Sequence, residues 1–355
     1  MTPASPALTR ILVGRGALAH AADEVRECAI VLLVADASLE RVARGLATTM
    51  GAQRPVALEL LPGGDASKSL ATAEALWDRW LATGAGRDAL VVALGGGSIT
   101  DVAGFAAACF LRGVPWVAIP STVLGMADAA IGGKTGVNTG AGKNLVGALH
   151  APQAVLADLD LLAGLSEAAY ADGWAEVVKA GVIGDAALFE DLERDAAAVR
   201  RRDLGVVEDL LARAIRVKVA VVEADACESS RREILNFGHT VAHALEAATR
   251  GAMSHGRAVA VGMVAEGWLA EARGRLSSVD VARIAAACRA LGLDRSVAPG
   301  IRDEDLRAAL SKDKKRRAGQ LRVALPSGLG SHDAAPGVTC DPRELMDALE
   351  RARAL

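Results

Sequence analysis

Short apolar runs alternate with amphipathic segments along the first 155 residues of the chain. The apolar runs predict buried strands over residues 29–35, 56–60, 89–94 and 116–119. Between them, apolar positions at helical spacing predict helices near residues 39–50, 70–82 and 99–111. Because the strand segments are apolar on both faces and alternate with helices, the pattern predicts a parallel sheet covered on both sides.

The pattern changes after Pro152, where runs typical of strands nearly disappear. Helical periodicity extends through residues 166–183, 204–224, 232–248, 255–270, 279–291 and 342–352, and residues 320–325 allow one short strand. A chain of 355 residues exceeds the usual size of a single core, so we expect two domains. We place the boundary within residues 150–165, with an α/β domain over residues 1–155 and an all-α domain over residues 156–355.

The composition excludes several functional classes. Aromatic residues make up 3% of the chain and the net charge is −3, so neither a stacking surface nor a basic footprint indicates nucleic-acid binding. Five cysteines, an odd number without a CxxC pair, are typical of a reducing compartment. The chain shows neither a basic-then-apolar leader nor an unbroken apolar run of about 18 residues. We therefore expect a cytoplasmic protein with no membrane partner.

Two lysines, Lys134 and Lys143, each follow a glycine in the stretch ADAAIGGKTGVNTGAGKNLVG. A P-loop requires Gly, four further residues and then Gly-Lys-Ser/Thr. Asp128 stands at the first glycine position before Lys134, and Asn144 replaces the hydroxyl residue required after Lys143. The stretch is therefore a poor nucleoside triphosphate site, and another anion has to explain the lysines.

The motif LGGGSITD, residues 94–101, follows a predicted strand and opens a predicted helix. Glycines at such a junction let a ligand approach the backbone, and the N–H groups of the helix start favour a pyrophosphate. The motif is not a GxGxxG fingerprint, because Thr100 stands where the last glycine should be, so a tight turn explains it equally well. Asp36, just after the first of these strands, is placed either to bind a ribose or to cap the next helix.

Three of the six histidines lie between residues 239 and 255. In the predicted helix over residues 232–248, Asn236, His239 and His243 share one face. Two histidines four residues apart commonly chelate Zn²⁺, although the HExxH pattern is absent. His255 follows at a predicted helix start. The clustering favours a metal site over isolated structural histidines.

Glu176 and Lys179 lie one helical turn apart in the otherwise apolar segment WAEVVKAG. A surface ion pair would explain them, but charges on an apolar helix more often mark a site, because burying an unpaired charge is costly. Further cations are Lys218, Arg232 and the run SKDKKRR at residues 311–317. A cleft that gathers several of these cations suits a substrate carrying both phosphate and carboxylate.

Taken together, the motifs resemble those of the 3-dehydroquinate synthase family over nearly the whole chain. The matching segments, in order, are PGGDASKSL, GGGSITDVAGFAAACFLRG, D-x3-GGKTGVN-x3-GKNLVGA, AEVVKAG, RREILNFGHTVAHALE, SHG and DKKRRAG. The resemblance implies a dehydroquinate synthase-like fold, with a Rossmann-like α/β N-terminal domain and an all-α C-terminal domain. It also implies conversion of 3-deoxy-D-arabino-heptulosonate 7-phosphate to 3-dehydroquinate and phosphate, in aromatic amino-acid biosynthesis. In that reaction NAD⁺ oxidises the substrate transiently, phosphate is eliminated, the hydride returns and an aldol step closes the ring.

The resemblance also implies roles for individual residues. Glu176, His239 and His255 would ligate Zn²⁺ or Co²⁺, so His243 would not be a ligand but would lie beside the substrate and take part in proton transfer. Arg112 would reach the phosphate from the neighbouring subunit of a homodimer. The substrate would be held by Asp128, Lys134, Asn144, Lys179, Lys218, Arg232, Asn236 and either Lys314 or Lys315. The NAD site would be lined by Asp65, Lys68, Gly96, Gly97, Ser98, Asp101, Ser121 and Thr122, with Asp36 if it binds ribose and Lys143 if it faces NAD rather than substrate.

Some positions depart from the family pattern, but none removes an expected metal ligand or substrate lysine. They are Asp65, Gly164 to Ser166, Ser230, Arg231 and Arg257. Three alternatives remain open: a cyclase for another sugar phosphate, such as an aminodehydroquinate synthase, a metal- and NAD-dependent polyol dehydrogenase, and a non-catalytic binding protein. The intact GGKTGVN block and the number of cations favour 3-dehydroquinate synthase.

Overall fold

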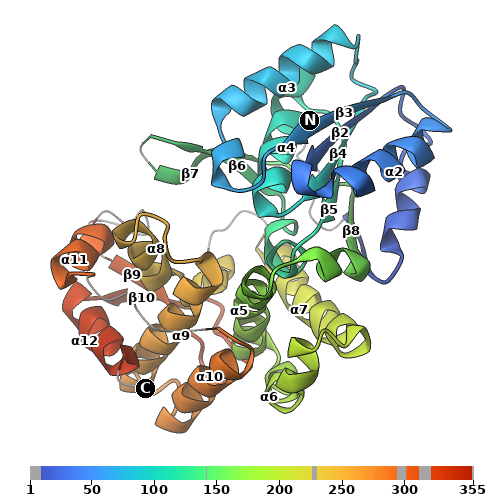
Figure 1. Cartoon of the computed structure of the whole chain (residues 1–355). Helices are drawn as coiled ribbons and strands as arrows, with labels where there is room; N and C mark the ends of the chain where they lie inside the picture. The colour runs from blue at the N-terminus through green and yellow to red at the C-terminus, as the bar shows by residue number, and fades with distance from the viewer. Residues whose placement is uncertain (1–8, 141, 226–229, 294–300, 312–320, 354–355) are drawn as a thin grey trace. The chain divides into compact units, whose positions relative to one another are not determined.

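The computed structural model describes residues 9–140, 142–225, 230–293, 301–311 and 321–353. The chain divides into two compact units, residues 1–165 and 166–355. The first unit is α/β and the second is mainly helical (Figure 1), which confirms the predicted fold class. Within the described ranges, no helix has both the length and the apolar character needed to cross a membrane.

A six-stranded parallel sheet forms the centre of the first unit, in the order β1-β8-β5-β4-β2-β3. Its strands are β1 (Arg10–Gly14), β2 (Val31–Asp36), β3 (Val56–Leu61), β4 (Leu90–Gly95), β5 (Trp116–Pro120) and β8 (Ala154–Asp158). The predicted strands correspond to β2, β3, β4 and β5. We did not predict β1, an edge strand that begins with an exposed arginine, or β8, which follows the change of pattern at Pro152.

Helices cover both faces of this sheet (Figure 1). They are α1 (Ala21–Glu24), α2 (Glu40–Gly51), α3 (Leu70–Ala82) and α4 (Gly97–Cys109). Leu32 and Val34 of β2 pack into the core that contains α3 and α4, whereas Val31 and Leu33 pack into the core that contains α2. Because successive side chains of a strand point to opposite faces, a strand buried on both faces is apolar at every position.

The glycine–lysine stretch forms an antiparallel hairpin of β6 (Lys134–Thr139) and β7 (Gly142–Leu149), preceded by the short π-helical segment η6 (Gly125–Ala129). It therefore lacks the strand–loop–helix geometry of a P-loop. The sequence did not predict these strands. Glycines and polar residues interrupt both strands, and Leu145, Val146 and Leu149 of β7 are apolar but exposed, so neither strand has the pattern of a buried strand.

The second unit consists of helices and one small antiparallel sheet, β9 (Leu321–Ala324) with β10 (Gly337–Cys340). Its described helices are α5 (Glu167–Gly184), α6 (Ala186–Arg200), α7 (Leu204–Ala224), α8 (His239–Ala248), α9 (His255–Ala272), α10 (Ser278–Ala290), α11 (Asp303–Ser311) and α12 (Pro342–Arg353). The periodicity located all of these except α6 and α11. The helix predicted over residues 232–248 is confirmed from His239 onward but starts too early, because residues 231–236 form the separate 3₁₀ helix η8 (Arg231–Asn236) and α8 begins at His239.

Candidate functional site: a sheet edge and a buried metal-ligand cluster

The carboxyl ends of β2, β4 and β5 lie side by side in the first unit. Ala35 of β2 pairs with Leu94 of β4, and Gly95 pairs with Pro120 of β5. The strand order reverses between β2 and β4, since the chain proceeds from β2 to β3 on one side and from β4 to β5 on the other. Ligands of open parallel sheets bind at this kind of reversal, beyond the carboxyl ends of the strands.

Three predicted cofactor segments meet at this edge. Gly96 is the N-cap of α4 and no side chain caps that helix, so its first N–H groups face the end of β4 as an anion site requires. The amide of Ser121 donates to Gly95 O at 2.9 Å, which places the Ser121–Thr122 turn beside the glycines. Asp36 accepts hydrogen bonds from the Ser38 amide at 2.9 Å and from the Ser38 hydroxyl at 2.7 Å. These hydrogen bonds show Asp36 in the capping role, one of the two roles that the sequence left open.

The predicted residues Lys68, Asp101 and Asn144 form one polar group in the same unit, in which Lys68 is buried, Asp101 is half-buried and Asn144 is exposed. The ammonium of Lys68 contacts the Asp101 carboxylate and donates to Oδ1 of Asn144, and Lys68 is only 6% exposed. Asn144 adopts φ 55°, and its amide donates to Oδ1 of Asn138 at 3.2 Å. Sequence reasoning missed Asn138, although it is the last residue of the quoted GGKTGVN block.

Two further lysines of the hairpin lie near the surface. Lys143 forms an ion pair with Asp65 at 2.6 Å, so two residues predicted to contact the cofactor or substrate contact each other. Lys134 is exposed at the start of β6, and Asp128 is half-buried in η6. Arg112 is exposed and has φ 71°, between Leu111 at 49° and Gly113 at 114°.

Three side chains of the second unit form a cluster with the composition of a metal site. Glu176 lies in the middle of α5, His239 is the first residue of α8, and His255 is the first residue of α9. One ligand atom from each lies within 4.8 Å of the other two. Nε2 of His239 and Nε2 of His255 each lie 3.3 Å from the same carboxylate oxygen of Glu176. The cluster does not include His243, whose ring lies edge-on to that of His239, with centroids 5.7 Å apart.

The Nδ1 atoms of both histidines have fixed acceptors. Nδ1 of His239 lies 3.1 Å from Phe237 O, and Nδ1 of His255 lies 3.2 Å from Oε1 of Glu246. An acceptor at Nδ1 favours the tautomer that leaves the Nε2 lone pair available to a metal. One carboxylate and two imidazoles, with a position left for substrate, fit Zn²⁺ or Co²⁺ at a catalytic site.

The charges of the cluster are strongly coupled. Burial alone would raise the pKa of Glu176, but the Lys179 ammonium and the two histidines hold it well below its ordinary value. Burial and the Lys179 charge together lower the pKa of His239. Burial would also lower the pKa of His255, but hydrogen bonds with Glu176 and Glu246 raise it to about 10. The two histidines differ because His255 faces two carboxylates, whereas His239 faces one carboxylate and a cation.

Close backbone approach brings the two histidines to Glu176. A Cβ on Gly256 would stand 1.8 Å from Asp172 O, so only glycine lets the start of α9 pack this closely against α5. Gly238 has φ 80°, a left-handed conformation that separates η8 from α8. Asn236 therefore ends η8 instead of sharing a helical face with His239 and His243, which corrects the prediction made from their spacing.

Buried cations lie on α5, η8 and α7, elements that contact one another. Nζ of Lys179 contacts the Glu176 carboxylate and donates to Leu235 O at 2.8 Å. Arg232 in η8 is 2% exposed, and Lys218 of α7 is 8% exposed. The amide of Arg232 donates to Oδ2 of Asp225 at 3.0 Å, which fixes the start of η8. Lys314 and Lys315 lie outside the described residues.

Sequence reasoning missed two acidic residues that contact the cluster's helices. Glu246 accepts from His255 and lies in the quoted HALE segment. Glu266 is completely buried in α9 and accepts from three backbone amides at the start of α8. The signal that singled out Glu176 was its pairing with Lys179 in an apolar helix, whereas Glu266 stands as a single carboxylate in the apolar part of α9.

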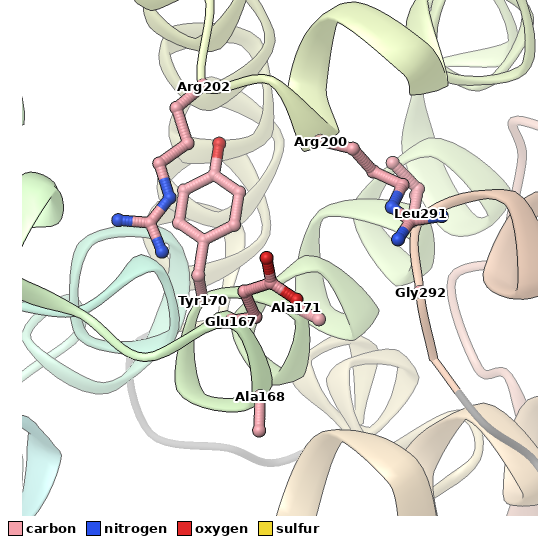
Figure 2. A pocket seen from close by; sticks show the side chains of 8 residues that line it. All are labelled: Glu167, Ala168, Tyr170, Ala171, Arg200, Arg202, Leu291 and Gly292. Carbon is pink, nitrogen blue, oxygen red and sulfur yellow. The ribbon is translucent and has the colours of Figure 1, made fainter.

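A separate surface hollow of about 370 Å³ lies at the start of α5 (Figure 2). It is lined by Glu167, Ala168, Tyr170, Ala171, Arg200, Arg202, Leu291 and Gly292. The guanidinium of Arg202 stacks on the Tyr170 ring, 4.6 Å from its centroid, and the Tyr170 hydroxyl donates to Val199 O. None of the predicted site residues lines this hollow.

The fold and the site define the class of this protein: a chain that combines a dinucleotide-binding fold with a metal site. Its first unit has the parallel sheet and ligand edge of dinucleotide-binding folds. Its helical second unit holds a carboxylate and two histidines arranged for a metal. Family models described as 3-dehydroquinate synthase N-terminal and 3-dehydroquinate synthase C-terminal match residues 59–172 and 173–316. A 3-dehydroquinate synthase from Mycobacterium leprae (strain TN) is 47% identical over 290 residues, 81% of this chain and 79% of that protein. The chain belongs to the 3-dehydroquinate synthase family.

Solved structures of related cyclases share the whole fold. The 2-epi-5-epi-valiolone synthase from Streptomyces hygroscopicus subsp. jinggangensis 5008, with NAD⁺ and Zn²⁺ bound, has a TM-score of 0.87 and 31% identity, and the match covers 98% of this chain and 97% of that chain. A 2-deoxy-scyllo-inosose synthase complexed with carbaglucose-6-phosphate, NAD⁺ and Co²⁺ has a TM-score of 0.88 and 26% identity, over 96% of each chain.

Proposed function

We propose that this chain is an enzyme that converts 3-deoxy-D-arabino-heptulosonate 7-phosphate to 3-dehydroquinate and phosphate. The observation that carries the proposal is the cluster of Glu176, His239 and His255 beside the buried Lys179, in a chain of the 3-dehydroquinate synthase family. This reaction serves aromatic amino-acid biosynthesis. When bound, NAD would supply a hydride acceptor that is regenerated in each turnover, and Zn²⁺ or Co²⁺ would supply a Lewis acid for the substrate hydroxyls.

The first unit would hold NAD at the carboxyl edge of its sheet. The uncapped start of α4 offers N–H groups to the pyrophosphate, and no side chain projects from Gly96 or Gly97 to block it. Asp101 and Asn144 hold the Lys68 side chain in one position, so its ammonium group supplies a fixed positive charge near this edge. Related structures with NAD⁺ bound support this assignment. The proposed cofactor set is Asp65, Lys68, Gly96, Gly97, Ser98, Asp101, Ser121, Thr122 and Lys143, and Asp36 would join it by contacting the ribose in addition to capping the turn after β2.

The second unit would hold the metal and the anionic groups of the substrate. Lys179 is fixed by Glu176 and by Leu235 O, so its ammonium charge is held beside the metal cluster, where substrate oxygens would bind. Buried Arg232 and Lys218 suit the substrate carboxylate and phosphate, because charge-assisted hydrogen bonds strengthen when water is excluded. His243 is exposed one turn after His239, where it can accept and return a proton without binding the metal.

We also propose that the enzyme is a cytoplasmic homodimer in which Arg112 serves the partner's site. Arg112 is exposed and lies within three successive residues with positive φ, a costly conformation that functional positions retain.

The four described cysteines, Cys28, Cys109, Cys288 and Cys340, form no disulfide, which supports a reducing compartment.

The deciding experiment measures phosphate release from the heptulosonate 7-phosphate with catalytic NAD⁺, while NADH absorbance is followed. We expect stoichiometric phosphate without NADH accumulation, and loss of activity after treatment with a chelator. NADH accumulating with polyols would indicate a dehydrogenase instead. Release of phosphate only from an aminated analogue or another sugar phosphate would assign a related cyclase.

A further inference from the structure

The start of α8, which carries His239, has an unusual cap. Four other helices of the second unit begin at a Ser or Asp whose own side chain accepts a backbone N–H: Ser166, Asp185, Asp203 and Ser277. Helix α8 begins after Gly238, which has no side chain to do this. Its first N–H groups would remain unsatisfied in a buried setting, at a substantial cost in stability.

Glu266 of α9 takes the place of that missing cap. Its Oε2 accepts from the Gly238 amide at 2.6 Å, and its Oε1 accepts from the amides of Thr240 at 2.9 Å and Val241 at 3.1 Å. Glu266 has no exposed surface. The carboxylate is also stabilised by the positive end of the α8 dipole. Its bonds to Gly238 and Thr240 lie on either side of His239.

The backbone held by Glu266 determines where the His239 imidazole points. The Nδ1 acceptor of His239 is Phe237 O, one residue before Gly238. A Cβ on Gly262 would stand 1.9 Å from Gly238 O, so α8 and α9 approach closely enough for the Glu266 side chain to reach. Helix α9 also begins with His255, so the element that supplies one metal ligand fixes the backbone of the other.

We infer that Glu266 is the positioning residue for the metal ligand His239, because it locks the peptide on both sides of that histidine to the helix that carries His255. This inference rests on the proposed metal-dependent function. Its effect is exerted through the backbone, so Glu266 itself touches neither metal nor substrate. A neutral amide at this position cannot accept from all three N–H groups, since its nitrogen is a donor.

The test compares Glu266→Gln with Asp158→Asn. Asp158 is a matched control, because it is a buried carboxylate of the first unit that accepts from the amides of Gly16, Leu18 and Asp160. We expect both variants to unfold at lower temperature, but only Glu266→Gln to lose Co²⁺ and Zn²⁺ affinity, by about 10- to 100-fold in chelator competition. The visible absorption of bound Co²⁺ should also change in Glu266→Gln alone, since it reports coordination geometry.

Each outcome bears on the inference. Unchanged metal affinity and Co²⁺ spectrum in a folded Glu266→Gln protein would overturn it, as would equal losses in both variants. His239→Ala separates the two proposals: a wild-type protein that binds metal no better than His239→Ala would overturn the metal-dependent function itself. If Glu266→Gln does not fold, hydrogen exchange of the wild-type amides of Gly238, Thr240 and Val241 decides. By linkage, Co²⁺ should slow their exchange, and unaffected exchange would contradict the inference.

Discussion

Nε2 of His255 lies 3.3 Å from Oε1 of Glu176, although the two residues are 79 positions apart in the chain. Glu176 lies deep in α5 and His255 opens α9, so their approach depends on how closely the two helices pack. Gly256 permits that packing because a Cβ would stand 1.8 Å from Asp172 O. The metal cluster is therefore built by a close helix crossing and not by a local sequence motif.

Gly256→Ala should disturb the metal cluster without changing any ligand. The added methyl group must push α9 away from α5, and overpacking of this kind costs about 1–3 kcal/mol. We expect a lower midpoint of urea unfolding together with weaker Co²⁺ binding. Gly45→Ala in α2 is the control, because nothing lies within 4 Å of its Cβ position and alanine favours helix. Unaltered metal binding in Gly256→Ala would show that the cluster tolerates movement of α9.

His239→Ala and His243→Ala should separate metal binding from proton transfer. His239 belongs to the cluster, so its loss should lower metal content and reduce kcat/KM by more than about 100-fold. His243 lies outside the cluster, so His243→Ala should retain metal while kcat falls by about 10²-fold or more, as for loss of a general acid–base group. Metal content and initial rates of phosphate release measure both effects. Loss of metal in His243→Ala would restore the pairing that spacing alone suggested.

Lys68→Met should weaken NAD binding and leave metal binding intact. The variant removes a buried cation that pairs with Asp101 and Asn144, so the Asp101 carboxylate loses this ion pair. We expect the Kd for NAD⁺ to rise by about 10-fold or more in calorimetric titration. Zinc content should match that of the wild type, because Lys68 and the metal cluster lie in different units. An unchanged Kd would remove Lys68 from the cofactor site.

Mixing two inactive variants tests whether Arg112 acts across a dimer. Arg112→Ala lacks the arginine offered to the partner, and His239→Ala lacks a metal ligand of its own site. A mixed dimer regains one intact site, so random exchange should restore about a quarter of the wild-type activity. Light scattering must show a dimer for the mixture and for each variant. Persistent inactivity of a mixture shown to have exchanged would place Arg112 in its own subunit's site or outside the site.

Asp185→Asn should destabilise the second unit in a pH-dependent way. Burial alone would raise the pKa of Asp185, but hydrogen bonds from Arg213 and from the Leu188 amide lower it below the ordinary value. A lowered folded pKa gives stabilisation above the unfolded pKa of about 3.9 that is lost as pH falls through the folded value. The free energy of unfolding of the wild type should therefore exceed that of Asp185→Asn by about 1 kcal/mol near neutral pH, and the two free energies should converge in acid. A difference in urea midpoints that persists in strong acid would contradict this.

The periodicity of the sequence predicted the elements whose burial is regular. Strand β4 is apolar throughout, and β2 is apolar up to its last residue, Asp36, because both faces are covered, and α7 shows a clear apolar stripe. The hairpin β6–β7 gave no such signal because glycines interrupt both strands and the apolar residues of β7 are exposed. Helices α6 and α11 were missed although α6 buries Leu188, Leu192 and Val199 and α11 buries Leu306 and Leu310. The helix over residues 232–248 was drawn through Gly238, since periodicity does not register a single left-handed residue.

For the site, the sequence alone supplied residue types suited to a metal and to anions, but its spacing paired His239 with His243, whereas the structure groups His239 with Glu176 and His255. Glu176 and Lys179 were recognisable as charges in an apolar helix, and the resemblance to a family selected His255 over His243. Only the tertiary structure decided that His239 and His255 meet at one oxygen of Glu176, that Asp36 caps η3 (Ala37–Leu39), and that Glu246 and Glu266 hold the two histidines. The physical reason is the sequence separation of the contacts involved. Burial and helical spacing act over a few residues and leave a periodic pattern in the sequence. The close helix crossing at Gly256 and the left-handed turn at Gly238 bring together residues far apart in sequence, and only single glycines mark them.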